Sequence, residues 1–150
     1  MMRYSDIQVV LQEVPGEVSI CFTITGCPIN CLGCHSPYLW KKGSGELLTL
    51  EKYHQVLKKY QCFASCVLFM GGEWHQNELI EYLELAQKMG FSTCLYTGLN
   101  EVKNEIKFEL TWLKTGQWIK EYGGLTSSKT NQKFIHVKSY KILNHLFIKN

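Results

Sequence analysis

The chain has 150 residues, 45% of them hydrophobic, and a formal net charge of +3. This length indicates a single domain over residues 1–150, and the hydrophobic content excludes a disordered chain. The lysines are dispersed until the C-terminal third, so the dense basic patch of a nucleic-acid-binding protein is missing. No apolar run approaches the length of a membrane span. Seven cysteines without a signal peptide favour a reducing cytoplasm.

Strand-like and helix-like segments alternate along most of the chain. Periodicity, glycines and a Thr49 helix cap predict strands over 7–13, 18–24, 66–70, 91–97, 110–114, 134–137 and 145–148, and helices over 49–60, 77–89 and 101–106. The turn at Pro15-Gly16 predicts that the first two strands form a hairpin. The later alternation predicts parallel pairing with right-handed crossovers. A complete eight-stranded α/β barrel needs about 250 residues, so any barrel is truncated and open, and a partner protein could cover its open side.

Three cysteines, Cys27, Cys31 and Cys34, follow the second predicted strand within eight residues. Thiolates suit iron–sulfur clusters and zinc. A cubane cluster usually takes four cysteines, so three would leave one iron open to a substrate or cofactor. The competing hypothesis is a zinc knuckle with His35 as the fourth ligand, although adjacent residues rarely reach one metal without strain.

Gly71, Gly72 and Glu73 follow the buried strand predicted over 66–70. Two glycines allow the backbone to approach a ligand closely, and a carboxylate beside them can accept hydrogen bonds from an ammonium group. Glu73 could alternatively cap the next helix. Lys114 ends a later strand, where it is either a ligand-binding cation or a solvent-facing lysine.

The polar segment 116–133 is long for a loop in a compact domain, and such loops are usually functional or disordered. We expect it to frame a substrate entrance. The other cysteines are Cys21, Cys62, Cys66 and Cys94. They are expected in the core, although the spacing of Cys62 and Cys66 leaves a second cluster as an alternative.

The C-x3-C-x2-C spacing resembles that of the radical S-adenosylmethionine (SAM) enzymes. The short chain is similar to activating proteins of anaerobic ribonucleoside-triphosphate reductases over residues 7–134, with further matches at Gly71-Gly72-Glu73-Trp74, Tyr96-Thr97-Gly98, Leu113-Lys114-Thr115-Gly116 and Asn131-Gln132. This resemblance implies an α/β fold, a truncated and open radical SAM-type partial barrel. It also implies a cytoplasmic enzyme that uses a [4Fe-4S] cluster and SAM to generate a glycyl radical on the reductase.

The resemblance also implies roles for individual residues and partners. Cys27, Cys31 and Cys34 would hold the cluster. The SAM-binding residues would be Gly71, Gly72 and Glu73 at the amino group, Lys114 at the carboxylate, and the backbones of Gly33 and His35 at the adenine. The partners would be the large subunit of the reductase and a reducing electron-donor protein. The chain departs from the superfamily at Gly33, where an aromatic residue is common, and at Thr111, where the activating enzymes often have aspartate.

Two other classes of function are compatible with the cysteine motif. One is another small radical SAM enzyme, such as a pyruvate formate-lyase activator or a deazaguanine-forming synthase. The Tyr96-Thr97-Gly98 and Asn131-Gln132 matches argue against both of these enzymes. The other class is a zinc-binding interaction module.

Overall fold

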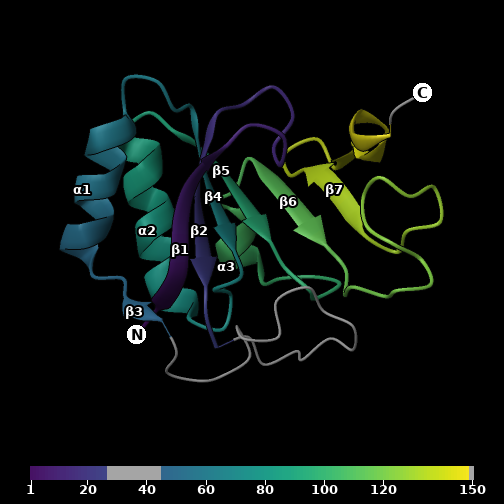
Figure 1. Ribbon diagram of the computed structural model, residues 1–150, viewed down its shortest axis with the longest axis horizontal. Coiled ribbons are helices and arrows are strands. Elements are labelled where there is room, and N and C mark those ends of the chain that lie inside the picture. Colours follow the sequence, from purple (N-terminus) through teal and green to yellow (C-terminus); the bar gives the residue numbers. More distant parts are fainter. Residues whose placement is uncertain (27–44, 149–150) are drawn as a thin grey trace.

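A computed structural model describes residues 1–26 and 45–148 of the chain. Eight strands form one mixed sheet, and helices lie along it (Figure 1). The elements in chain order are β1 (Arg3–Val10), β2 (Ser19–Ile24), β3 (Glu46–Leu47), α1 (Leu50–Tyr60), β4 (Cys66–Met70), α2 (Gln76–Lys88), β5 (Ser92–Tyr96), α3 (Asn104–Lys107), β6 (Trp112–Thr115), β7 (Lys133–His136), β8 (Lys141–Ile142) and the 3-10 helix η2 (Asn144–Phe147). No helix in the described part of the chain is long and apolar enough to cross a membrane.

The centre of the sheet is parallel, and its two margins are antiparallel. The strand order is β3-β1-β2-β4-β5-β6-β7-β8, and β2, β4, β5 and β6 all run in one direction. The predicted hairpin of β1 and β2 is confirmed. The described sheet has β3 at one edge and β8 at the other, so it does not close on itself. The structure therefore confirms the predicted α/β fold with a truncated and open sheet.

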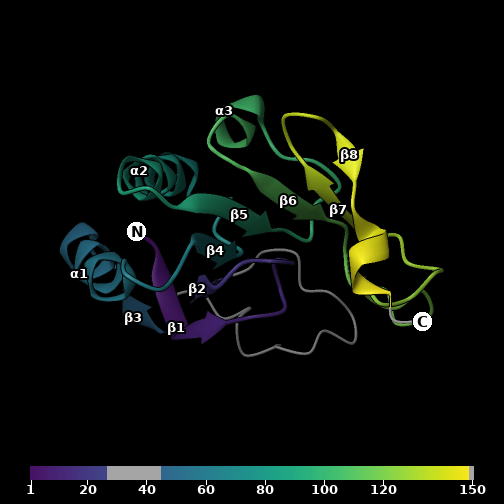
Figure 2. The same ribbon diagram turned by 90° about the horizontal axis from the view of Figure 1, so that it is seen from above.

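The sheet is curved, and α1, α2 and α3 all cover its convex side (Figure 2). Alternate residues of the strands supply two separate apolar layers. The layer beneath the helices is the main core and includes Phe22, Phe69 and Leu95. The layer on the concave side is smaller and includes Cys94, Leu125 and Phe134. The concave side is therefore left for loops and for a ligand.

Local signals explain where the helices begin and end. Thr49 caps α1 as predicted, because its hydroxyl accepts a hydrogen bond of 3.1 Å from the backbone nitrogen of Lys52. Gly90 follows α2 with a φ of +92°, a conformation that favours glycine.

Two predicted strands differ most from the structure, and the short strands β3 and β8 have no counterpart among the predicted ones. The first strand ends at Val10 instead of Glu13, because β2 begins at Ser19, which pairs with Val10 and leaves the residues between them as a turn. The strand predicted over 145–148 is wrong, since Asn144–Phe147 is a 3-10 helix. Asn144 uses its side chain to bond the backbone nitrogen of Phe134 at 2.8 Å and the carbonyl of Gln132 at 2.9 Å. These side-chain hydrogen bonds take the place of the backbone pairing that a further strand would make, so the chain leaves the sheet.

A buried tyrosine joins the two long helices beneath the sheet. The hydroxyl of Tyr53 on α1 donates a hydrogen bond of 2.7 Å to the carbonyl of Tyr82 on α2, and the two rings stack with centroids 4.5 Å apart. We predict that Tyr53→Phe lowers the free energy of unfolding by about 1 kcal/mol, because one buried hydrogen bond is lost while the ring stays in place. Urea titration measures the change. Tyr60→Phe on the same helix is the control and should change stability by less than half as much.

Candidate functional site

The predicted site residues converge on the edge of the sheet where the parallel strands end. Thr23 of β2 pairs with Met70 of β4, which in turn pairs with Tyr96 of β5. The chain leaves β2 at Ile24 toward the cysteine motif, and Gly71-Gly72-Glu73 leaves β4 beside it. Such edges carry the ligand sites of parallel sheets. Cys27, Cys31, Gly33, Cys34 and His35 themselves lie outside the described residues.

The two glycines after β4 have backbone conformations that side chains rarely adopt. Gly71 and Gly72 have φ values of +84° and +110°. A Cβ on Gly71 would lie 2.7 Å from the Trp74 ring, and one on Gly72 would lie 3.4 Å from the side chain of Ile24. The turn therefore presses against the residue that ends β2. This contact brings the start of the cysteine loop next to the glycine turn.

Glu73 presents a carboxylate with one satisfied and one unsatisfied oxygen. The Thr97 hydroxyl donates a hydrogen bond to Oε1 of Glu73. Oε2 is fully enclosed and has no hydrogen-bond partner within the described residues. Burial raises the pKa of this carboxyl group, while the hydrogen bond from Thr97 lowers it. The N-cap position of α2 is His75, so the contacts of Glu73 support ligand binding rather than helix capping.

Thr97 is the positioning residue that the sequence did not assign. It is 2% exposed, and its hydroxyl also accepts a hydrogen bond of 3.1 Å from the backbone nitrogen of Leu99. The hydroxyl proton is therefore directed to Glu73. Its place in the Tyr96-Thr97-Gly98 match was the available signal, but the match alone did not reveal the contact.

Lys114 lies on the concave side of β6 and is half-buried. Its Nζ atom lies 5.1 Å from the centroid of the Tyr96 ring on the neighbouring strand, a cation–π distance. The backbone carbonyl of Lys114 accepts a hydrogen bond of 2.9 Å from the nitrogen of Thr97. This placement disagrees with the alternative of a solvent-facing lysine and keeps the cation near the edge that holds Glu73.

The polar loop after β6 is closed at its base. Gly116 has a φ of +107°, and a Cβ there would lie 2.9 Å from Cα of Gln132. Asn131 Nδ2 donates to the carbonyl of Gln117 at 3.0 Å, and Gln132 Nε2 donates to the carbonyl of Gly116 at 3.3 Å. Gln132 is only 5% exposed. These two side chains therefore hold the two ends of the loop together.

The cysteines outside the motif occupy two kinds of environment. Cys21, Cys66 and Cys94 are buried in the concave apolar layer, whereas Cys62 is exposed. Burial raises the pKa of the Cys21 and Cys66 thiols to about 12. They are therefore neutral core thiols at physiological pH, and the different environments of Cys62 and Cys66 give no support to a shared second cluster.

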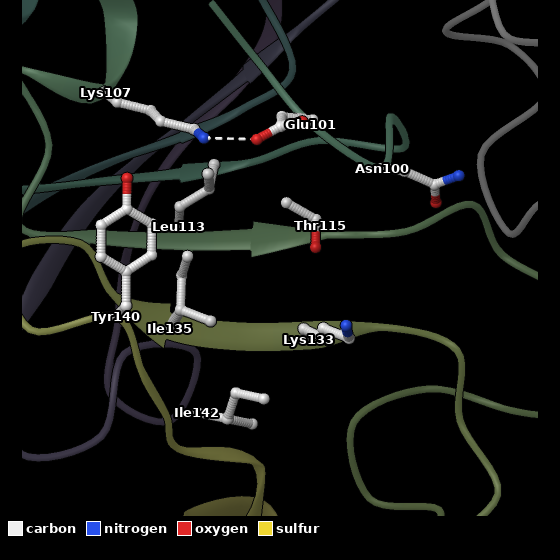
Figure 3. Close-up of a pocket in the computed structure, with 9 residues that line it drawn as sticks. All are labelled: Asn100, Glu101, Lys107, Leu113, Thr115, Lys133, Ile135, Tyr140 and Ile142. Atoms are coloured by element: carbon white, nitrogen blue, oxygen red, sulfur yellow. Dashed lines mark hydrogen bonds and ion pairs between the residues drawn. The ribbon is translucent and has the colours of Figure 1, made fainter. Parts of the chain in front are cut away.

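A separate pocket of about 220 Å³ lies on the side of β6, β7 and β8 that carries Leu113, Ile135 and Ile142 (Figure 3). Lys107 and Glu101 at its rim form an ion pair of 2.7 Å. Leu113 belongs to the layer beneath the helices, so this pocket is on the opposite side of the sheet from Lys114. We therefore exclude it from the candidate site.

A family model described as a 4Fe-4S single cluster domain matches residues 14–121. The chain belongs to this family. The match covers the cysteine motif, the glycine turn and Lys114, which are the parts of the chain that form the candidate site. A search of curated proteins found no significant match.

Among solved structures, the chain is similar to QueE from Escherichia coli, with a TM-score of 0.56 and 22% sequence identity. The similarity covers 68% of this chain and 55% of the QueE chain, so this chain spans little more than half of that protein. At this identity the likeness shows the fold alone, an open mixed α/β sheet with parallel central strands.

The description of the matched family names a 4Fe-4S cluster, and the motif resemblance implies SAM as the second cofactor. The described residues fit the amino-acid end of SAM. The unsatisfied Oε2 atom of Glu73 is an acceptor for an ammonium group, and the enclosed Nε1 atom of Trp74 is a donor without a partner in the described part of the chain. The glycine turn between β4 and these residues gives a ligand access to the backbone.

Replacing Glu73 should separate ligand binding from stability. We predict that Glu73→Gln weakens SAM binding about ten- to a hundredfold, because a charge-assisted hydrogen bond is lost. The same change should raise the Tm of the cofactor-free protein by roughly 2–4 °C, because a buried charge is removed. Calorimetric titration of the reconstituted protein and a thermal melt measure the two effects. A helix-capping role would instead lower the Tm and leave SAM binding intact.

The pH dependence provides a second readout of the same change. Burial raises the pKa of Glu73 above its ordinary value of 4.5. When the pH is lowered, the carboxylate should therefore take up its proton, and SAM affinity should fall, before the pH reaches 4.5. Folding stability of the cofactor-free protein should change in the opposite direction, because protonation relieves the buried charge. Glu73→Gln should remove both dependences, whereas Glu81→Gln, at an exposed position on α2, should retain them.

Proposed function

We propose that this chain is an activating enzyme that generates a glycyl radical on the large subunit of an anaerobic ribonucleoside-triphosphate reductase. One observation supports this assignment above the others. Two segments are similar to the reductase activators, Lys114-Thr115-Gly116 and Asn131-Gln132. They lie at the two ends of the loop between β6 and β7 and contact each other through Gly116 and Gln132. The loop begins where β6 ends, at the same edge as Glu73 and Thr97.

The open sheet suits a polypeptide substrate. The described strands leave β3 and β8 as separate edges, with a concave side that the helices do not cover. A segment of another protein can enter such a surface from the side, whereas a closed barrel would exclude it. The long loop between β6 and β7 would then border the entrance, and a reducing electron-donor protein would be the second partner.

When bound, a reduced [4Fe-4S] cluster and SAM would supply the one-electron cleavage of SAM into methionine and a carbon radical able to abstract a hydrogen atom. The protein supplies placement and exclusion of water. Cys27, Cys31 and Cys34 would hold three irons, and the backbones of Gly33 and His35 would contact the adenine. Glu73, fixed by Thr97, would accept the ammonium group of SAM, and Lys114 would face its carboxylate. Gly71 and Gly72 would let the ligand approach the backbone.

The cysteine motif should carry all of the iron. We predict that alanine at Cys27, Cys31 or Cys34 abolishes the cluster and SAM cleavage, because a site-differentiated cubane needs all three thiolates. Iron and sulfide analysis after anaerobic reconstitution measures the loss. Cys62→Ala is the matched control and should retain the iron of the wild type. A loss of about half the iron on replacing Cys62 and Cys66 would reveal a second cluster.

The proposed reaction has a direct spectroscopic test. We predict that the reduced holoenzyme and SAM, mixed with the large subunit of an anaerobic reductase from the same genome, produce a glycyl radical on that subunit. Electron paramagnetic resonance should show a doublet from the remaining α-hydrogen, and alanine at the acceptor glycine of the partner should remove it. Strong SAM cleavage without any radical on the partner would disprove the reductase assignment and leave the radical SAM assignment standing.

A further inference from the structure

A cavity of about 520 Å³ lies on the concave side of the sheet, and apart from Lys114 its walls have no role in the site described above. Its walls come from the turn between β1 and β2, the ends of β5 and β6, the loop after β6, and η2. These segments are far apart in the sequence and are brought together only by the curvature of the sheet (Figure 2). The volume lies within the range of roughly 300–1,000 Å³ that is usual for ligand sites.

Glu13 contributes an unsatisfied carboxylate oxygen at this cavity. Its Oε2 atom is fully enclosed and has no hydrogen-bond partner among residues 1–26 and 45–148. A buried acceptor without a donor is costly, so such atoms usually bind water, an ion or a ligand. Glu13 lines the cavity, and a ligand there could supply the missing donor.

The turn that carries Glu13 is held from two directions. The Tyr96 hydroxyl donates a hydrogen bond to the backbone carbonyl of Glu13, which links the turn to the end of β5. The next residue, Val14, is fully buried in the concave apolar layer. The backbone at Glu13 is therefore held in place before a ligand arrives, which lowers the entropy cost of ordering this turn on binding.

The other walls provide a cation and apolar contacts. Lys114 lines the cavity from β6, with its Nζ atom 5.1 Å from the centroid of the Tyr96 ring. Leu125 and Phe147 line it from the loop and from η2. A ligand that offers a hydrogen-bond donor to Glu13 and an acceptor to Lys114 fits these walls. A peptide unit has this combination, since it carries one N–H donor and one C=O acceptor.

We propose that this cavity binds the backbone of the substrate polypeptide next to its acceptor glycine, with the Glu13 carboxylate accepting a backbone N–H. This inference rests on the proposed function and adds a substrate-binding residue to it. A glycine has no side chain to keep its N–H away from the carboxylate, so Glu13 would favour glycine at this position. Lys114 would then lie between the SAM carboxylate and a carbonyl of the bound segment.

The test compares Glu13→Gln with Glu17→Gln in the reduced holoenzyme. Glu17 belongs to the same connection between β1 and β2 but does not line the cavity, so it is the matched control. With the reductase large subunit as substrate, Glu13→Gln should raise the KM for that subunit about ten- to a hundredfold. It should leave the Kd for SAM and the uncoupled formation of 5′-deoxyadenosine unchanged. Glu17→Gln should leave all three quantities unchanged.

A synthetic peptide that spans the acceptor glycine gives a binding readout that does not require turnover. Calorimetry should detect its binding to the wild type and to Glu17→Gln, and about tenfold or weaker binding to Glu13→Gln. Equal binding by both variants, or a KM unaffected by Glu13→Gln, would overturn the inference while the wild-type radical signal keeps the proposed function. Binding of guanine to the cavity instead of the peptide would also overturn it, because a fused heterocycle with N–H groups could satisfy Glu13. If the wild type forms no radical on the reductase, the proposed function fails and this inference fails with it.

Discussion

The parallel register of β2, β4 and β5 is the constraint on which the site depends. Because Thr23, Met70 and Tyr96 lie side by side across these strands, the segments that follow them leave the sheet at one edge. One of these segments leads to the cysteine motif, the second is the glycine turn, and the third supplies Thr97. A shift of one residue would turn Thr97 away from Glu73. The strand pairing therefore determines the chemistry of the site, although none of the pairing atoms takes part in it.

The site combines atoms that are unfavourable in the free protein. Glu73 and Glu13 each hold an enclosed carboxylate oxygen without a partner in the described residues, and Gly71, Gly72 and Gly116 all have positive φ angles. The enclosed carboxylate oxygens cost stability unless a ligand supplies a donor, whereas glycine adopts positive φ angles without steric strain. The three large aromatic rings of Tyr53, Phe22 and Phe69 pack together on the other side of the sheet. The rigid layer beneath the helices can therefore support a concave side that is incomplete without its ligands.

The sequence predicted the parts of the protein that depend on local pattern. Alternation predicted β2, the Thr49 cap predicted α1, and the strand before Gly71-Gly72-Glu73 predicted the edge at which Glu73 lies. It did not predict contacts that join distant segments. Glu13 was expected to end a strand, and its position at a cavity depends on a hydrogen bond to Tyr96, which is 83 residues away. The 3-10 helix was missed for a similar reason, because the Asn144 side chain bonds to the backbone of Phe134 and Gln132.

The closed base of the loop between β6 and β7 affects how this protein could change during evolution. Because Gly116 and Gln132 join the two ends, β6 and β7 can pair as a simple hairpin whatever the length of chain between them. Insertions or deletions inside the loop then cost little folding free energy, since closure entropy grows slowly with length. Leu125 is the exception, as it is buried in the concave layer and fastens the loop at its middle. Exchange of the segments on either side of Leu125 would therefore reshape the surface beside this edge of the sheet while the fold stays the same.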